Sequence, residues 1–505
     1  MSVRHLQKKY IIRGSKLILL SCCLLLSLSA CVVQRSPVTG HKRAYAYSWS
    51  QEVQMGKEAN GQVKQQYGLY DNPTLAKYVS MIGDSVLDHS DMRGPNVDPK
   101  YRNTPFHYQV LNSSIVNAFA LPGGYVYITR GILAALNNEA QLAVVLGHET
   151  GHVAARHASQ SALEQKAGQL ALVGGAVVGQ QALGLPADQI LQLGGMATKL
   201  LFLRYSRDDE READRLGVEY SAKAGYHSSD ASAFFTTLKR MQEQSGQTLP
   251  SMMSTHPDPG DRQQTIKQLA AEWKNKGYKM TIEDQKKYYK EIDGIIYGDN
   301  PREGFTKNGM FYHPQLKFQF PVPNDWQVYN QTSQVILANK DQSAVMIMSV
   351  DTNRTPQASV QAFLNQQGII TIKTNSTNKH NLTGYEGYAT ATTQQGDVKV
   401  YLYAVSYGGN IYRFLDYTTP DQFDNMVGNF TNTAYGFSSL TDQSILNIQP
   451  VRIHVVDVQK DTRFSDLLPQ KLPMDIKPED VAILNQVKLD DIIKKGTPVK
   501  IPVQK

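Results

Sequence analysis

Cysteine is nearly absent from this chain of 505 residues. The three cysteines are Cys22, Cys23 and Cys31, so everything after residue 31 lacks a disulfide, a cysteine nucleophile and a thiolate metal ligand. Any zinc site in the folded part must therefore use histidine and carboxylate side chains. Apolar runs of the ~20 residues that a membrane-spanning helix needs are also missing.

A strong excess of one charge is lacking as well. The net charge is +7, but the first 30 residues carry five Lys or Arg and no acidic residue, and the remainder carries 47 basic and 45 acidic residues. Nothing in this balance indicates a nucleic-acid partner. Hydrophobic residues make up 41% and charged residues 19%, which is typical of globular proteins, and the length predicts two to four domains.

The N-terminus has the pattern of an export signal, with a basic start and an apolar stretch from Leu17 to Leu28. It ends in Leu28-Ser29-Ala30-Cys31, which looks like a bacterial lipobox. We expect a signal peptide over residues 1–30, a lipid on Cys31 and a polar tether over residues 31–46. The alternative is an uncleaved anchor helix. Val32 after the cysteine favours the outer membrane, and the expected location is the periplasmic side of the bacterial envelope.

A helix that starts near Asn138 carries the main chemical motif. Asn138 can cap it, and Gln141 stands where a capping box has Glu or Gln. Apolar residues follow and lead to His148-Glu149-x-x-His152. Helical spacing places His148 and His152 on one face, where both imidazoles can bind one metal ion. Glu149 lies beside them and can take a proton from metal-bound water.

A second helix is expected to supply the third ligand. It begins after Ser206, a plausible cap, with Asp209 at the box position, and Gly225 is a plausible stop. Glu210 and Asp214 are four residues apart and share a face, so Glu210 can bind zinc while Asp214 orients a ligand histidine or another site group. The alternative is a solvated, charged helix start.

Two β-prone runs separated by Pro122-Gly123-Gly124 come directly before the metal helix. The first run, with Asn117, Ala118 and Ala120, could offer a strand edge for an extended peptide substrate. Beyond the metal helix, residues 163–203 are rich in Ala, Leu, Gly and Gln. They could form buried helices or a hairpin that touches the membrane or gates the substrate.

These motifs resemble those of the zinc metallopeptidases typified by CAAX prenyl protease and the heat-shock protease HtpX. The resemblance spans about residues 36–298 and is closest to the BepA-like periplasmic lipoproteins. Gln141, where many members carry Glu, is a departure, as is the lack of the transmembrane helices of HtpX and the helical repeats of BepA. The matching segments are His148 to His152, Glu210-x-x-Ala213-Asp214, Asn117 to Gly124, and Ser254-Thr255-His256-Pro257 followed by Arg262.

The resemblance implies a mainly helical, gluzincin-type zinc peptidase domain with a small β-sheet over residues 47–298. It implies one zinc ion per chain, with His148, His152 and Glu210 as ligands and Glu149 as general base. We expect Arg262 or His256 to stabilise the oxyanion of the reaction. His256 lies in a loop rich in Ser, Pro and Gly, and the alternative is that it occupies the vacant zinc position at rest and keeps the peptidase latent.

The remaining chain changes in character after residue 300. Alternating residues predict a small α+β domain over residues 308–440 with no group of catalytic residues. Residues 450–505 resemble a degenerate LysM module through Asp461-Thr462, Leu484-Asn485 and Lys495 to Pro502, although Lys460 replaces the expected glycine. The module could bind glycan, or it could be a structural remnant or docking surface. Overall, the sequence predicts the α+β class.

The leading hypothesis for function is a lipid-anchored zinc endopeptidase that cleaves unfolded or misassembled envelope proteins. Its expected partners are polypeptide substrates, the membrane through Cys31, and outer-membrane assembly machinery or peptidoglycan. The alternatives are an envelope chaperone or assembly adaptor with a latent zinc site, and a peptidoglycan-associated binding protein. Glu149 favours the enzyme, because a purely structural zinc site needs no general base.

Overall fold

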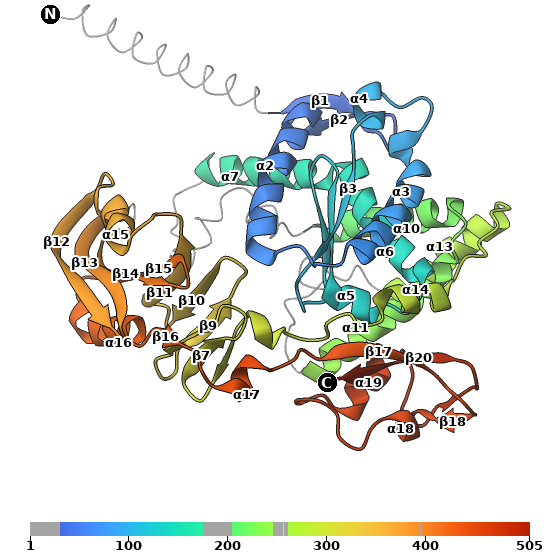
Figure 1. Cartoon of the computed structure of the whole chain (residues 1–505). Helices are drawn as coiled ribbons and strands as arrows, with labels where there is room; N and C mark the ends of the chain where they lie inside the picture. Colours follow the sequence, from blue (N-terminus) through green and yellow to red (C-terminus); the bar gives the residue numbers. More distant parts are fainter. Residues whose placement is uncertain (1–30, 175–204, 246–255, 257–260, 394–395) are drawn as a thin grey trace, which may run out of the picture.

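The computed structural model describes residues 31–174, 205–245, 256, 261–393 and 396–505. The expected signal peptide, most of the apolar segment that was expected to form helices or a hairpin, and the residues around His256 lie outside these ranges. The described chain combines helices with several sheets (Figure 1), in agreement with the expected α+β class. Within the described ranges, no helix has the length and apolarity needed to cross a membrane.

The helical part of the chain surrounds a three-stranded sheet with the order β3-β5-β4. Strand β5 (Tyr125–Thr129) runs parallel to β3 (His107–Leu111) and antiparallel to β4 (Ala118–Leu121). The longer helices are α2 (Trp49–Tyr67), α3 (Pro73–Asp88), α5 (Arg130–Ala135), α6 (Glu139–Ala155), α7 (His157–Gly174), α10 (Arg207–Lys223), α11 (Ala231–Ser245), α13 (Arg262–Asn275) and α14 (Gln285–Ile292). Every residue of α6 is buried, which explains why the helix itself carries apolar side chains on all of its faces.

Helices α6 and α10 cross with their backbones in contact. A Cβ atom added at Gly217 would lie 2.8 Å from the backbone nitrogen of His148, and one added at Gly147 would lie 2.9 Å from the carbonyl oxygen of Gly217. Only glycine permits so close an approach. The crossing therefore brings the start of α10 against the part of α6 that carries the histidines.

Residues 31–46, which were expected to be a tether, instead form a hairpin that packs on the peptidase region. Strand β1 (Val32–Arg35) pairs antiparallel with β2 (Lys42–Tyr45), and Tyr45 is fully buried. The hairpin is fixed by Arg156, the residue that ends α6 in a left-handed conformation (φ 63°). Its guanidinium donates to the side-chain oxygen of Gln34 at 2.8 Å and to Glu52 at 2.9 and 2.5 Å. Composition did not reveal this contact, because its partners are far apart in sequence.

A second group of elements forms a seven-stranded antiparallel sheet with the order β12-β13-β14-β15-β11-β10-β9. Its strands are β9 (Gln327–Asn330), β10 (Gln334–Ala338), β11 (Ala344–Asp351), β12 (Ile369–Lys379), β13 (Leu382–Thr393), β14 (Gly396–Tyr407) and β15 (Asn410–Thr418). Helices α15 (Pro356–Leu364) and α16 (Phe423–Tyr435) cover opposite faces of this sheet. In β14, Leu402 packs with α15, while its neighbours Tyr401 and Tyr403 pack with α16. A small second sheet joins β6 (Phe305–Lys307), β7 (Met310–His313), β8 (Phe318–Pro321) and β16 (Ser438–Ser439).

The C-terminal segment packs against the peptidase region (Figure 1). Strands β17 (Arg452–Asp457) and β20 (Pro498–Val503) pair antiparallel, with α18 (Phe464–Leu467) and α19 (Pro478–Leu484) between them. The ammonium group of Lys500 is fully buried and donates to the carbonyl oxygens of Ala134 and Leu136 at 2.6 and 2.9 Å, at the end of α5. A cation is favoured at this end of a helix, although burial lowers the pKa of Lys500 well below its usual value. The resemblance of the C-terminal segment to a LysM module stays a prediction.

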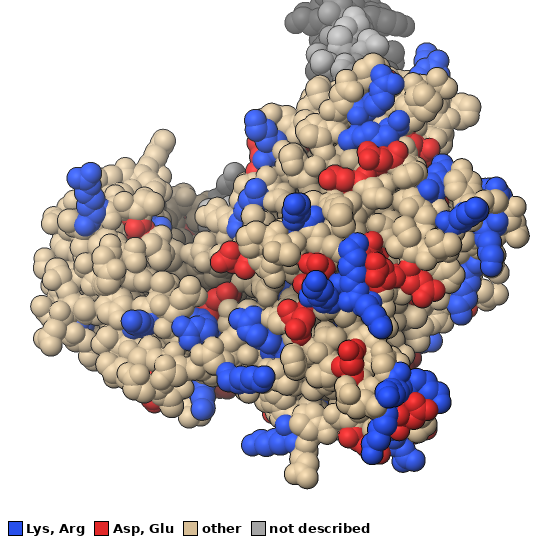
Figure 2. All heavy atoms as spheres, turned by 45° about the vertical axis from the view of Figure 1, so that its right-hand side comes forward, with Lys and Arg blue, Asp and Glu red and all other residues tan. Residues whose placement is uncertain are grey.

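Basic and acidic side chains lie interspersed over the face of the molecule in Figure 2. This distribution matches the near balance of charge outside the first 30 residues.

Candidate metal centre

Helix α6 begins at its predicted cap. The side-chain oxygen of Asn138 accepts a hydrogen bond from the backbone N–H of Gln141 at 2.9 Å. The second half of the expected capping box differs, because the Gln141 carboxamide accepts from the N–H of Asn137 at 2.8 Å instead. The helix then places the Nε2 atoms of His148 and His152 3.0 Å apart, both buried. The predicted shared face of the two histidines is confirmed.

Helix α10 also begins and ends as predicted. Ser206 and Asp209 form a complete capping box, and Gly225 follows the helix with a left-handed φ of 93°. The crossing with α6 brings Glu210 to the histidines, with its Oε2 3.5 Å from His148 Nε2 and its Oε1 3.5 Å from His152 Nε2. Glu210 is fully buried, which excludes the solvated alternative for this residue.

His256 joins the same group from a separate part of the chain. Its Nδ1 lies 2.9 Å from Glu210 Oε1 and 3.4 Å from His148 Nε2. One ligand atom from each of His148, His152, Glu210 and His256 lies within 4.8 Å of all the others. Three imidazoles and one carboxylate thus converge in a buried position where a single divalent metal ion could be held.

Glu149 faces this group without belonging to it. Both carboxylate oxygens are buried and have no hydrogen-bond partner among the described residues, and the nearest ring nitrogen is His256 Nε2 at 3.6 Å. Burial raises the pKa of Glu149 above its usual value. A carboxylate so placed is available to accept a proton close to the metal position.

Asp214 holds the ring of His148 in place. Its Oδ1 lies 2.9 Å from His148 Nδ1, the nitrogen that points away from the other ligand atoms. Arg262 donates from Nε to Asp214 Oδ2 at 2.9 Å and makes a second contact to Oδ1. Burial alone would raise the pKa of Asp214, but Arg262 and His148 outweigh it, so the pKa is lowered and the carboxylate stays charged. This is the arrangement by which a carboxylate fixes the orientation of a ligand histidine.

Known proteins with similar sequences share this region. The model of peptidase family M48 matches residues 77–270, which include His148, Glu149, His152, Glu210 and His256. The beta-barrel assembly-enhancing protease of Escherichia coli K12 is 29% identical over 231 residues, 45% of each chain. The bovine mitochondrial metalloendopeptidase OMA1 is 33% identical over 167 residues, 32% of this chain and 31% of its own. The metalloprotease YcaL of Escherichia coli K12 is 34% identical over 202 residues, 40% of this chain and 74% of its own.

This chain belongs to peptidase family M48. M48 peptidases use zinc, and the residues here fit that ion. Imidazole and carboxylate are its preferred ligands in the absence of cysteine. Glu210 Oε2 is buried and makes no hydrogen bond within the described chain. Its neighbours are His148 Nε2 at 3.5 Å and Arg262 Nη1 at 3.6 Å, which leaves the oxygen able to bind a cation. The chain spans less than half of the beta-barrel assembly-enhancing protease, so the match concerns the peptidase region only.

Two residues of the M48 site were missed by sequence reasoning. His157 Nδ1 lies 2.9 Å from His152 Nδ1, so it contacts the second ligand histidine as Asp214 contacts the first. The ring of Tyr205 stacks on His152 with centroids 4.1 Å apart. His157 lies five residues after His152, but the left-handed turn at Arg156 that directs it inward has no signal in the sequence. Tyr205 directly precedes the predicted cap of α10 and could have been suspected from that position.

The other predicted site residues lie in distinct places. Ala118 and Ala120 are in β4, an edge strand that contacts α6, and both side chains are buried. Asn117 directly precedes β4, and its backbone N–H donates to Thr129 Oγ1 at 3.2 Å. Cys31 is exposed directly before β1.

Proposed function

We propose that this M48 protein is a zinc-dependent endopeptidase of the bacterial envelope that cleaves unfolded or misassembled polypeptides. The observation that carries the proposal is the buried carboxylate of Glu149, which faces three converging ligands on α6 and α10 without being one of them. A structural metal site has no use for such a carboxylate. The family and the metalloendopeptidases among the relatives support the same activity.

His148, His152 and Glu210 would hold the zinc ion. When bound, zinc supplies a Lewis acid that polarises the scissile carbonyl and lowers the pKa of water toward ~7. Glu149 accepts the proton of the attacking water and returns it to the leaving amine. Asp214 and Arg262 act as positioning residues, because they fix the ring of His148 through the contacts at 2.9 Å.

The substrate would lie extended along β4. Within the described sheet, β4 pairs with β5 on one side only, so its other edge has no strand partner there. The buried side chains of Ala118 and Ala120 leave the backbone as the group that recognises the peptide. Such recognition favours unfolded chains, because a compact protein presents no free strand.

His256 would be a fourth ligand at rest. Its Nδ1 lies 2.9 Å from Glu210 Oε1, within the ligand group, which supports the resting-ligand reading. An imidazole in this place occupies the position that water needs, so the peptidase would be latent until substrate displaces it. In the alternative reading, His256 donates to the oxyanion. Arg262 is less suited to that role, because its guanidinium is engaged with Asp214.

The place in the cell follows from Cys31. We propose that the lipid on Cys31 holds the protein on the periplasmic side of the outer membrane, where misassembled membrane proteins and the machinery that assembles them are its partners. The name of the Escherichia coli relative, a beta-barrel assembly-enhancing protease, supports this setting. The C-terminal segment, with two strands flanking two helices, would be a LysM-like module that serves as a docking surface, with peptidoglycan as a second possible ligand.

A comparison of envelope proteomes tests the proposal. Cells with Glu149→Gln should accumulate uncleaved substrates that copurify with the variant, while wild-type cells should not. Equal proteomes, together with no cleavage of any unfolded protein by the purified wild-type chain, would refute it.

A further inference from the structure

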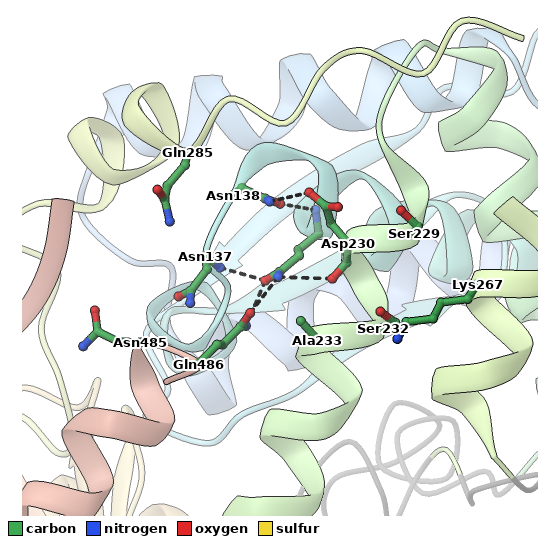
Figure 3. Close-up of a pocket in the computed structure, with 11 residues that line it drawn as sticks. Asn137, Asn138, Ser229, Asp230, Ser232, Ala233, Lys267, Gln285, Asn485 and Gln486 are labelled. Carbon is green, nitrogen blue, oxygen red and sulfur yellow. Dashed lines mark hydrogen bonds between the residues drawn. The ribbon is translucent and has the colours of Figure 1, made fainter. Parts of the chain in front are cut away.

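A polar cavity of about 580 Å³ lies at the start of the metal helix α6 (Figure 3). Its walls come from α6, α11, α13, α14, the turn at Ser228–Asp230 and the residues that follow α19. The volume is within the range of small-ligand sites. Six carboxamide side chains line it: Asn137, Asn138, Gln141, Gln285, Asn485 and Gln486.

Neither the start of α6 nor the carboxylate of Asp230 is open to a charged ligand, and the one cationic side chain of the lining, Lys267, is exposed. The first free N–H groups of α6 are already occupied, since Glu139 and Ala140 donate to the carbonyl oxygen of Glu283 and Gln141 donates to Asn138. An anion would therefore find no free helix terminus. The two carboxylate oxygens of Asp230 are also engaged, one by Asn138 Nδ2 at 2.7 Å and one by His227 Nδ1 at 2.6 Å.

One pair of side chains already displays the bonding that a neutral ligand would use. Gln141 Nε2 donates to Gln486 Oε1 at 2.9 Å, and Gln486 Nε2 donates back to Gln141 Oε1 at 3.1 Å. A peptide unit carries the same donor and acceptor as a carboxamide, so it can replace either partner in this arrangement.

Asn137 gives the cavity an unused acceptor. The residue is 6% exposed, and its Oδ1 has no hydrogen-bond partner among the described residues. This oxygen is buried against the wall, so a donor from a bound ligand satisfies it when the Asn137 side chain turns toward the cavity. The observation points to a ligand with an N–H or O–H group.

We infer that this cavity is a docking site for an extended polypeptide segment that is recognised through its backbone amides. The inference rests on the proposed peptidase function and adds a second substrate contact to it. Among the lining residues, Ala233 is the single apolar side chain and no aromatic ring is present, so the cavity offers neither a pocket for a large apolar side chain nor a platform for a sugar ring. Recognition through the backbone makes docking independent of sequence, as a protease of unfolded chains requires.

The cavity is close enough to the metal centre to serve the same substrate. Gln141 precedes His148 by seven residues, or about 10 Å along the helix. Every residue of α6 is buried, so a substrate chain would pass around the helix; at about 3.3 Å per residue it needs more than the three residues of the direct line. A segment docked at Gln141 thus raises the local concentration of the same chain at the metal centre.

The test measures binding of an unfolded polypeptide to the full-length chain with Glu149→Gln, which should bind substrate without cleaving it. The probe is fluorescein-labelled lysozyme, reduced and alkylated with iodoacetamide so that it stays unfolded. Ala233→Trp should fill the cavity without removing a polar group and raise the dissociation constant at least fivefold. Asn137→Leu, which removes the unused acceptor, should raise the dissociation constant as well.

Lys239→Trp is the matched control, because Lys239 is an exposed residue of the same helix that does not line the cavity. It should bind the probe as its parent does, and circular dichroism and zinc content verify that every variant is folded. Unchanged binding in both cavity variants would overturn the inference. So would a cavity that binds the trimer of N-acetylglucosamine while Ala233→Trp leaves lysozyme binding intact. The proposed function fails separately, if the chain with Glu149 in place cleaves no unfolded protein.

Discussion

Replacing Glu149 by glutamine should abolish hydrolysis while the zinc ion stays bound. The ligand atoms of His148, His152 and Glu210 lie within 4.8 Å of one another, and Glu149 is not part of that group. Glutamine has nearly the same shape as glutamate and fits the same buried space, but it cannot accept the proton. A positioned general base contributes about 10²–10⁴-fold to a rate. We therefore expect kcat to fall by that factor, a rise of about 2.7–5.4 kcal/mol in the barrier.

Glu210→Ala supplies the contrast. It removes one of the three proposed ligands and leaves two imidazoles, so the variant should lose both zinc and hydrolysis. Glu219→Ala is the matched control, because Glu219 is on the same helix and pairs with Lys223 and Arg215 away from the site. It should retain zinc and hydrolysis.

The assay combines metal analysis of the purified variants with cleavage of unfolded lysozyme. The wild type and Glu149→Gln should each carry about one zinc per chain, and Glu210→Ala should carry far less. Full zinc content in Glu210→Ala would move the third ligand elsewhere. More than a tenth of wild-type kcat in Glu149→Gln would show that another group takes the proton.

Three further predictions concern other parts of the chain. Under the resting-ligand reading, His256→Ala raises hydrolysis or self-cleavage while zinc stays bound, whereas under the oxyanion-donor reading it lowers turnover on every substrate; unchanged rates would contradict both. Cys31→Ser should release the protein from membranes or leave the precursor uncleaved, which cell fractionation and labelling with palmitate measure; an unlabelled wild type that fractionates like the variant would contradict the lipid anchor. Burial raises the pKa of Asp416 well above its usual value, so the folded state holds a proton that the unfolded state has lost, and stability falls as pH rises above about 4. Asp416→Asn cannot ionise, so its stability advantage over the wild type should be larger at pH 8 than at pH 5. Urea unfolding followed by tryptophan fluorescence, to which Trp326 in the same core region contributes, measures this, and parallel pH profiles would refute it.

The parts of the site that depend on local spacing could be predicted from the sequence. The shared face of His148 and His152 follows from the period of a helix. The cap at Asn138 and the box at Ser206 follow from side chains that can accept from the free N–H groups at a helix start. The spacing of four residues from Glu210 predicted that Asp214 orients a ligand histidine or another site group, and in the structure its partner is His148. Family resemblance added His256, whose distance along the chain carries no geometric information.

The parts that depend on contacts between distant residues could not be predicted. Gln141 looked like a simple departure at a helix start, but its carboxamide pairs with Gln486, 345 residues away, in a bond that needs a donor and an acceptor on each side. Glutamate at residue 141 would lack the donor, which gives the departure a physical reason. The polar composition of residues 31–46 suggested a tether, since it does not reveal that Gln34 and Tyr47 meet the guanidinium of Arg156.

With the proposed lipid on Cys31, the hairpin of β1 and β2 would set how far the protein reaches from the membrane. A lipidated protein with a long linker can reach substrates throughout a deep layer of the periplasm. Here Cys31 is one residue, about 3.8 Å of chain, from a strand that Arg156 joins to the end of the metal helix. With lipid on Cys31, the catalytic centre would stand at a nearly constant height above the bilayer. Proteins that remain close to the membrane surface would be within reach, and chains that diffuse freely through the periplasm would be met only when they come to that surface.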